Sequence, residues 1–422
     1  MKTFIQMILM VLSFFSLACA DIETFVPKAV QIGDPAVSYA NIEFTADGRY
    51  MVWFEMVEKG KAGGTVWHCA IDPKTGELSP RDGKGFRAYE SSFMGRANPG
   101  MDAKGSYYVG LDNKGSLILV RPASGISGQV SVLPTPPDIT RRAIYPTNLP
   151  AQSSGFVYWI KNEKQPGGGM SRQNNWFELQ TISLEDPERI HTVARQDRPK
   201  KGFAPMDIGF VRWIGGKTLL TYGVFDEDKR VQIMAYDANN PKSGSKPLTD
   251  DPHSKIDPFG WTYNGSEILL AGIDGKAVGQ VYIRKSGESR FNQTETIVPT
   301  NSGLEKPGLA QSFEPFEFGG KAYAVYQINN RPQQAFFWNI TFSQPGEIWM
   351  TTLFQEHQQQ WRLTPGSDTP VAEPEPVVGD GKAWVFYNAT PKEGFMAGVW
   401  KLYRAETPLD SKGSSTRMLN TK

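Results

Sequence analysis

The chain has 422 residues, of which 21% are charged and 12% aromatic, so it can bury a sizeable core. Its 45 basic and 44 acidic residues nearly cancel, and no basic stripe stands out. This balance argues against an electrostatic nucleic-acid binder, so no nucleic-acid partner is expected.

The first 20 residues have the pattern of a secretory signal peptide. Lys2 gives a positive start, residues 5–17 are apolar, and residues 18–20 form a small-x-small cleavage site. The mature chain is therefore expected to begin at Asp21 and to be secreted or periplasmic. The alternative is a lipoprotein anchored through Cys19. No other run approaches the ~18 apolar residues of a transmembrane segment, so none is expected.

After cleavage, Cys69 is the only cysteine left in the chain. An intramolecular disulfide or a cysteine metal site is then impossible. Cys69 stands in the apolar run "TVWHCAID", which predicts a buried and inert thiol.

One phrase recurs along the rest of the chain, and it is clearest in "DPFGWTYNGSEILLAG" and "NIEFTADGRYMVWFE". An aromatic or acidic stretch leads into a tight turn with glycine, and an aromatic-rich apolar run follows. The turns recur roughly every 50 to 65 residues, a spacing typical of propeller blades. They lie at Asp47-Gly48, Lys104-Gly105, Ser154-Gly155, Gly215-Gly216, Asn264-Gly265, Gly319-Gly320 and Asp380-Gly381.

The runs after each turn are rich in Val, Ile, Tyr, Trp and Phe, which favour strands, and no long amphipathic helix is evident. Several short strands per repeat predict an all-β, seven-bladed β-propeller over residues 21–407, followed by a flexible tail over 408–422. Six blades is the alternative, because copies two to four of the phrase are degenerate. The propeller is expected to be a monomer.

The phrase resembles the repeat of TolB-like, or WD40-like, propellers, and the resemblance covers nearly all of the mature chain. No counterpart of the α/β domain that precedes the propeller of TolB itself is expected in this sequence. The resemblance implies the fold and says little about function.

The two ends of the repeat region are expected to meet. The seventh repeat has only two clear strands after its turn, and the segment 23–34 precedes the first repeat without a partner of its own. We predict that this segment supplies the outer strand of the last blade and closes the ring.

Catalytic signatures are scarce. "GGKT" at 215–218 lacks the earlier glycine and the helix of a phosphate-binding loop, which favours a hairpin turn. His68, His191 and His357 stand in strand-like runs, where a structural role is the default. His253 is predicted to lie in a loop between blades.

The residue before proline near the start of several repeats is polar or acidic, as in Asp257-Pro258, Glu314-Pro315 and Glu375-Pro376. The resemblance implies that such blade-entrance residues share one face and surround a central channel. The alternative is that they only cap turns. The expected binding residues are Asn98, Tyr145, His253, Asp257, Glu314, Glu375 and Trp338.

Two long segments, 161–175 and 329–346, are expected to flank this face, the second with the aromatic run Phe336 to Trp338. The alternative for the second segment is an extra hairpin that simply packs on the fold.

Two functions follow. The first is a binding propeller for a glycan or for an envelope or extracellular protein. The second is a polysaccharide lyase or glycoside hydrolase, with His253, Tyr145 and Arg142 as candidate catalytic residues. Asp257, Glu314 and Glu375 are candidate ligands for Ca or Mg in the channel.

Overall fold

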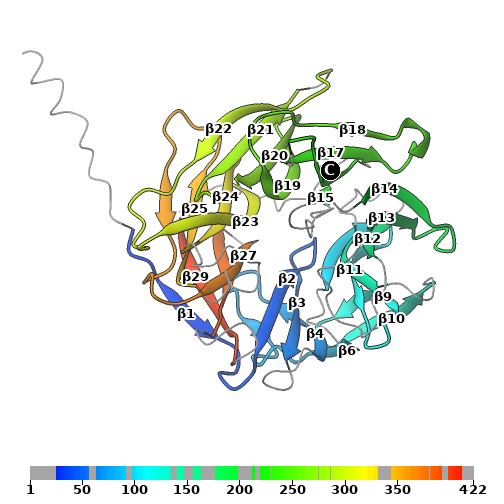
Figure 1. Ribbon diagram of the computed structural model, residues 1–422. Helices are drawn as coiled ribbons and strands as arrows, with labels where there is room; N and C mark the ends of the chain where they lie inside the picture. The colour runs from blue at the N-terminus through cyan, green and yellow to red at the C-terminus, as the bar shows by residue number, and fades with distance from the viewer. Residues whose placement is uncertain are drawn as a thin grey trace, which may run out of the picture.

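The structure is a computed structural model in which seven antiparallel sheets stand around one axis like the blades of a propeller (Figure 1). The predicted seven-bladed β-propeller is therefore confirmed, and the six-bladed alternative is wrong. The described residues are 25–56, 63–91, 97–134, 140–146, 155–162, 176–197, 212–213, 219–228, 230–273, 275–285, 287–330, 344–379, 381–391 and 398–410. The predicted signal peptide, Cys19, Trp338 and residues 411–422 of the predicted tail lie outside them. The predicted start of the tail at 408 is wrong, because residues 408–410 are the end of the last strand, which begins at Lys401.

Each of the first four blades runs from an inner strand to an outer strand. Blade 1 is β2(Tyr39–Phe44), β3(Tyr50–Met56), β4(Gly64–Ile71), β5(Leu78–Ser79) and β6(Phe86–Ser91). Blade 2 is β7(Asn98–Asp102), β8(Gly105–Leu111), β9(Leu117–Ser124) and β10(Ser127–Leu133). Blade 3 is β11(Thr140–Pro146), β12(Phe156–Asn162), β13(Trp176–Ser183) and β14(His191–Asp197). Blade 4 is β15(Arg212–Trp213), β16(Leu219–Phe225), β17(Val231–Asp237) and β18(Ser245–Pro247).

The last three blades follow the same order. Blade 5 is β19(Lys255–Tyr263), β20(Ser266–Ile273), β21(Gly279–Arg284) and β22(Asn292–Ile297). Blade 6 is β23(Pro307–Phe318), β24(Lys321–Asn330), β25(Gly346–Thr352) and β26(Gln360–Arg362). Blade 7 is β27(Val371–Val378), β28(Lys382–Ala389), β29(Lys401–Asp410) and β1(Ala29–Ile32).

Blade 7 closes the ring with the first strand of the chain. β1 pairs antiparallel with β29, from Ala29 opposite Ala405 to Ile32 opposite Leu402. The prediction that segment 23–34 supplies this outer strand is confirmed. In Figure 1 the blue β1 lies beside the red β29, so the two ends of the described chain meet in one sheet.

The inner hairpins turn where the repeated phrase predicts. Gly48 and Gly265 have φ of 68° and 74°, a backbone conformation that glycine adopts without steric cost. The turn predicted at Gly215-Gly216 lies outside the described residues.

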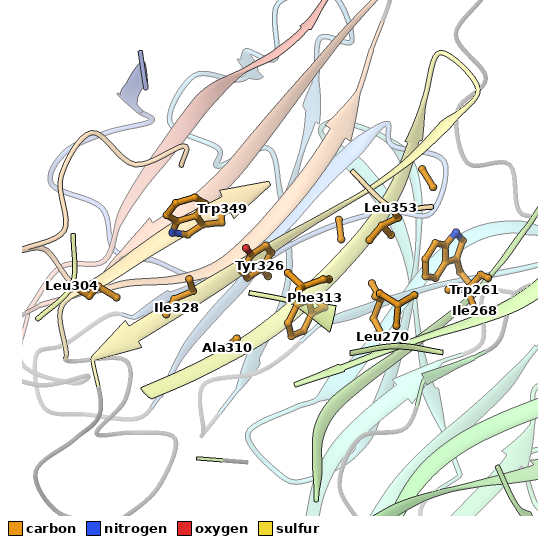
Figure 2. Packing of buried hydrophobic residues seen from close by; sticks show 14 residues of the cluster. Trp261, Ile268, Leu270, Leu304, Ala310, Phe313, Tyr326, Ile328, Trp349 and Leu353 are labelled. Atoms are coloured by element: carbon orange, nitrogen blue, oxygen red, sulfur yellow. The ribbon is translucent and has the colours of Figure 1, made fainter. Parts of the chain in front are cut away.

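The core consists of apolar layers between neighbouring blades. Figure 2 shows the layer between blades 5 and 6, where Trp261 and Leu270 of one blade meet Phe313 and Tyr326 of the other. Phe313 and Tyr326 stack with ring centroids 5.2 Å apart. Each layer joins two adjacent blades, so the inner strands stand around a common axis. The connections between strands then lie on the two faces of the ring.

Within the described part of the chain, the only helix is a 3-10 turn at Pro241–Ser243. No helix there is long and apolar enough to cross a membrane. His68 and His191 lie in strands as expected. The prediction for His357 is wrong, because His357 lies in the exposed connection between β25 and β26, where a run of Gln and Glu continues no strand.

Candidate functional site

We call the side where the chain enters each blade the blade-entrance face. It also carries the connections between the second and third strands, whereas the opposite, hairpin-turn face carries the first and third connections of each blade. On the blade-entrance face, four inner strands contain a bulge whose residue has positive φ. These residues are Asn41, Asp257, Ser312 and Glu373, with φ between 47° and 54°.

The bulges correct the predicted alignment of the pre-proline residues. Asp257, Glu314 and Glu375 lie inside β19, β23 and β27 rather than in turns between blades. Asp257 sits in its bulge, whereas Glu314 and Glu375 each follow theirs. The structural equivalent of Asp257-Pro258 in blade 7 is therefore Glu373-Pro374. Because the inner strand is the edge of its sheet, proline is tolerated there.

The corrected alignment shows that a glutamate occupies the equivalent inner-strand position in three blades. Glu314 and Glu375 share it with Glu43 of blade 1, which the sequence analysis missed. We call these three residues the carboxylate arc. Each is half-buried on an inner strand of three consecutive blades. Each pairs across its hairpin with a residue buried against the following blade: Val52, Val325 and Phe386.

The bulge residues themselves join neighbouring blades. Asp257 Oδ2 accepts a hydrogen bond of 2.6 Å from the backbone N–H of Ser312. The N–H of Glu373 donates to Oε1 of Gln327, at 2.7 Å, in the preceding blade. These contacts give the bulges a structural role, since they hold adjacent inner strands in register.

No group of three or more His, Cys, Asp and Glu side chains in the described ranges is arranged to hold a metal ion. Asp257, Glu314 and Glu375, the predicted ligands for Ca or Mg, therefore do not form such a group. The offset between Asp257 and the two glutamates is one physical reason.

His253 lies in the connection between blades 4 and 5, as predicted, and a buried network fixes that connection. The Lys255 ammonium, with no exposed surface, lies 2.7 Å from Asp251 Oδ2 and donates to the carbonyl oxygen of His253 at 2.9 Å. The N–H of His253 donates to Asp251 Oδ1 at 2.9 Å. Burial lowers the pKa of Lys255, and the Asp251 carboxylate opposes this shift. His253 is thus half-buried on a rigid support.

A second buried network fixes the connections on either side of blade 6. The Glu347 carboxylate accepts hydrogen bonds from Ser302 Oγ, the N–H of Gly303, the indole of Trp349 and the hydroxyl of Ser367. Arg362 lies 3.2 Å away. Burial alone raises the pKa of Glu347, but the hydrogen bonds outweigh burial and the net pKa is lowered. Both networks make the blade-entrance face rigid around blades 5 and 6.

Blade 3 presents cations and an aromatic ring on the same face, on the other side of the ring from the carboxylate arc (Figure 1). The Lys161 ammonium lies 5.6 Å from the ring centroid of Trp176, and the Arg195 guanidinium carbon lies 4.9 Å from it. Glu178 lies between them, 3.8 Å from Lys161 and 3.3 Å from Arg195. We call these four residues the blade 3 cluster. It has two cations and one acid, so its local charge is positive.

The other predicted residues are placed as follows. Asn98 begins β7 and is only 3% exposed, so it belongs to the blade rather than to an open surface. Arg142 and Tyr145 lie in β11, the inner strand of blade 3, and their side chains are outside the described residues. Most of the segments 161–175 and 329–346 also lies outside them.

Two different reasons hide these residues in the sequence. Glu43 stands in the repeated phrase, but it is not followed by proline as Glu314 and Glu375 are. Lys161, Trp176 and Arg195 come together only through the register of three strands.

Comparison with solved structures gives the fold again. An oligogalacturonate lyase from Vibrio parahaemolyticus matches with a TM-score of 0.54 and 11% identity, over 91% of this chain and 96% of that one. An oligogalacturonate lyase in complex with manganese matches with a TM-score of 0.50 and 10% identity, over 91% and 99%. At such identities the similarity establishes the propeller architecture across the chain. No model of a known protein family matches the sequence, and no curated protein matches it.

Proposed function

We propose that this protein is an exported, TolB-like propeller that binds a glycan on its blade-entrance face. The observation that carries the proposal is the carboxylate arc of Glu43, Glu314 and Glu375 on three consecutive inner strands. Structural packing does not need an acid at this position, because blade 5 has Phe259 there. Carboxylates are acceptors for the hydroxyl groups that cover a sugar, and charged hydrogen bonds are among the stronger ones.

The blade 3 cluster supports the same proposal from the other side of the ring. Trp176 is half-buried and offers a large, rigid contact surface with little loss of conformational entropy on binding. Lys161 and Arg195 beside it favour an acidic group. The whole-chain match to oligogalacturonate lyases, whose name states a carbohydrate substrate, adds support.

The test is isothermal titration against a panel of neutral and acidic oligosaccharides. Glu43→Gln, Glu314→Gln and Glu375→Gln, made singly, should each weaken the best ligand about tenfold or more, as expected for a lost hydrogen bond to a charged group. Glu77→Gln, an exposed position on the hairpin-turn face, is the control and should bind like the wild type. If no glycan binds, or if only the control variant loses affinity, the proposal is wrong.

A second candidate function is glycan cleavage on the same face, by a lyase or a hydrolase. The observation that favours it is the rigid support of His253 by Lys255 and Asp251, which suits a positioned general base. Ultraviolet absorbance of unsaturated product would identify a lyase, and reducing-end assays a hydrolase. His253→Asn should then abolish turnover while the melting temperature and glycan affinity are retained. A wild-type protein that binds but never cleaves would leave binding as the function.

A further inference from the structure

The hairpin-turn face has a cavity of about 190 Å³ between blades 3 and 4. It is smaller than the usual site for a drug-sized ligand, which takes about 300 Å³ or more. The cavity therefore suits a ligand the size of a single sugar. It is lined by Phe156, Thr181, Ser183, Asp186, Arg189, His191, Tyr236 and Ala238.

One small residue, Ala238, borders the cavity at a position that a large residue fills in the seam between blades 5 and 6. Blade 4 follows its third strand with Ala238, whereas blade 6 has Leu353 and then Phe354 after β25. Phe354 stacks on Tyr263 of blade 5 at 5.5 Å, which fills the seam between blades 5 and 6. Among the described residues that line the cavity between blades 3 and 4, no ring takes the place of Phe354, and Phe156 and Tyr236 form apolar walls.

The wall of the cavity is held rigidly by its own backbone. His191 begins β14 opposite Thr181 of β13, and Phe156 of β12 stands opposite Ser183. In the turn between β13 and β14, the N–H of Glu185 donates to Ser183 Oγ at 3.2 Å. The N–H of Arg189 donates to the carbonyl of Asp186 at 3.3 Å. Such a turn holds its side chains in place before a ligand binds.

Several polar groups of this wall have no partner among the described residues. Within the described ranges of the chain, no hydrogen bond or ion pair engages the Arg189 guanidinium, the His191 ring or the Tyr236 hydroxyl. Tyr236 is only 4% exposed, and its hydroxyl is not among the fully buried polar atoms that lack a partner, so it remains open to the cavity it lines. Burial, with the nearby Asp237 charge, raises the pKa of Tyr236, so its hydroxyl stays protonated and can donate.

We propose that this cavity binds a monosaccharide-sized ligand that carries a carboxylate, a hexuronic acid in its simplest form. The Arg189 guanidinium pairs with the carboxylate, because its planar donors match both oxygens. Tyr236 and His191 bond ring substituents, Asp186 accepts from a hydroxyl, and Phe156 and Tyr236 cover the apolar side of the sugar ring. This site is separate from the blade-entrance face and does not depend on the function proposed for it.

The experiment titrates sodium D-glucuronate and D-galacturonate up to about 10 mM, the range expected for a ligand with few polar contacts, and follows binding by ligand-observed NMR. Neutral D-glucose is the matched probe without a carboxylate. Arg189→Gln should weaken hexuronate binding about tenfold or more. Ala238→Leu should abolish it by filling the cavity while the melting temperature is kept. Arg49→Gln, an exposed arginine on the same face of blade 1, should change nothing.

Binding of either hexuronate that requires both Arg189 and Ala238 supports the proposal, whichever epimer is preferred. The proposal is overturned if wild-type protein binds neither hexuronate, or if D-glucose binds as tightly. Undiminished binding by Arg189→Gln or Ala238→Leu also overturns it. Since Arg189 is exposed, Arg189→Gln is expected to fold, so the result does not rest on Ala238→Leu alone.

Discussion

The carboxylate of Asp257 in blade 5 accepts a hydrogen bond of 2.6 Å from the backbone N–H of Ser312 in blade 6. Both residues have positive φ, 47° and 52°, in equivalent bulges of adjacent inner strands. The contact therefore joins the inner strands of two adjacent blades.

Asp257→Ala is predicted to destabilise the fold by about 1–3 kcal/mol, because it leaves the Ser312 N–H without this acceptor. Alanine also tolerates positive φ less well than aspartate. Asp257→Asn keeps an acceptor oxygen and should cost less. Urea denaturation measures both differences. A change below about 0.5 kcal/mol for Asp257→Ala would mean that this hydrogen bond does little for stability.

Ring closure by β1 predicts the effect of an N-terminal deletion. Removal of residues 21–35 exposes the edge of β29 and strips Phe25, Ala29 and Ile32 from the clusters they pack against. At about 1.5 kcal/mol or more per large apolar side chain, discounted for partial burial, the loss should be about 3 kcal/mol. Thermal melting should show a clearly lower midpoint, with aggregation through the open edge.

Removal of residues 411–422 is the control for that deletion and should melt like the full chain. An unchanged midpoint and a monomeric elution profile for the 21–35 deletion would contradict the closure role.

The lowered pKa of Glu347 leads to a prediction about how the stability of the fold depends on pH. Its folded pKa lies below the ordinary value, so the unfolded chain binds more protons between the two values. The stabilisation is therefore present above the unfolded pKa of about 4.3 and is lost as the pH falls through the folded pKa. Glu347→Gln should cost about 3 kcal/mol at neutral pH, because Arg362 and several donors lose a charged partner.

The measurement is urea denaturation of both proteins at pH 7 and near pH 3. The difference between them should shrink at the acid end. Glu305→Gln, whose side chain is 82% exposed, should show no such trend. A gap that stays constant with pH would show that the Glu347 charge is not what the network needs.

The burial of Cys69 leads to a prediction about the reactivity of its thiol. The thiol has no exposed surface, and burial raises its pKa, so little thiolate forms and no reagent reaches it. Protein lacking residues 1–20 should react with a thiol reagent only in denaturant, with one thiol per chain. Rapid labelling of the native protein would show that blade 1 opens easily.

The repeated phrase was enough to predict the blades and the closure of the ring. It did not predict which residues of different blades are equivalent where a bulge offsets the inner strand. Seven glycine turns and the orphan segment before the first were enough for the blade count and the closure. The equivalence of Glu43, Glu314 and Glu375 was hidden because the bulge residues Asn41, Asp257, Ser312 and Glu373 have no residue type in common. The blade 3 cluster and the cavity around Arg189 and Tyr236 depend on contacts between strands and between blades, which no local pattern encodes.

The pairing of β1 with β29 also sets an order of events during synthesis. β1 emerges from the ribosome first, and its partner emerges only after every other strand of the ring. The pairing is thus among the most non-local contacts in the chain, and such contacts form slowly. Until residue 410 has emerged, β1 carries an unpaired edge beside six blades that can already fold. A nascent chain stalled at β28 is therefore the species most exposed to mispairing, and the last ten-residue strand is the step that ends this risk.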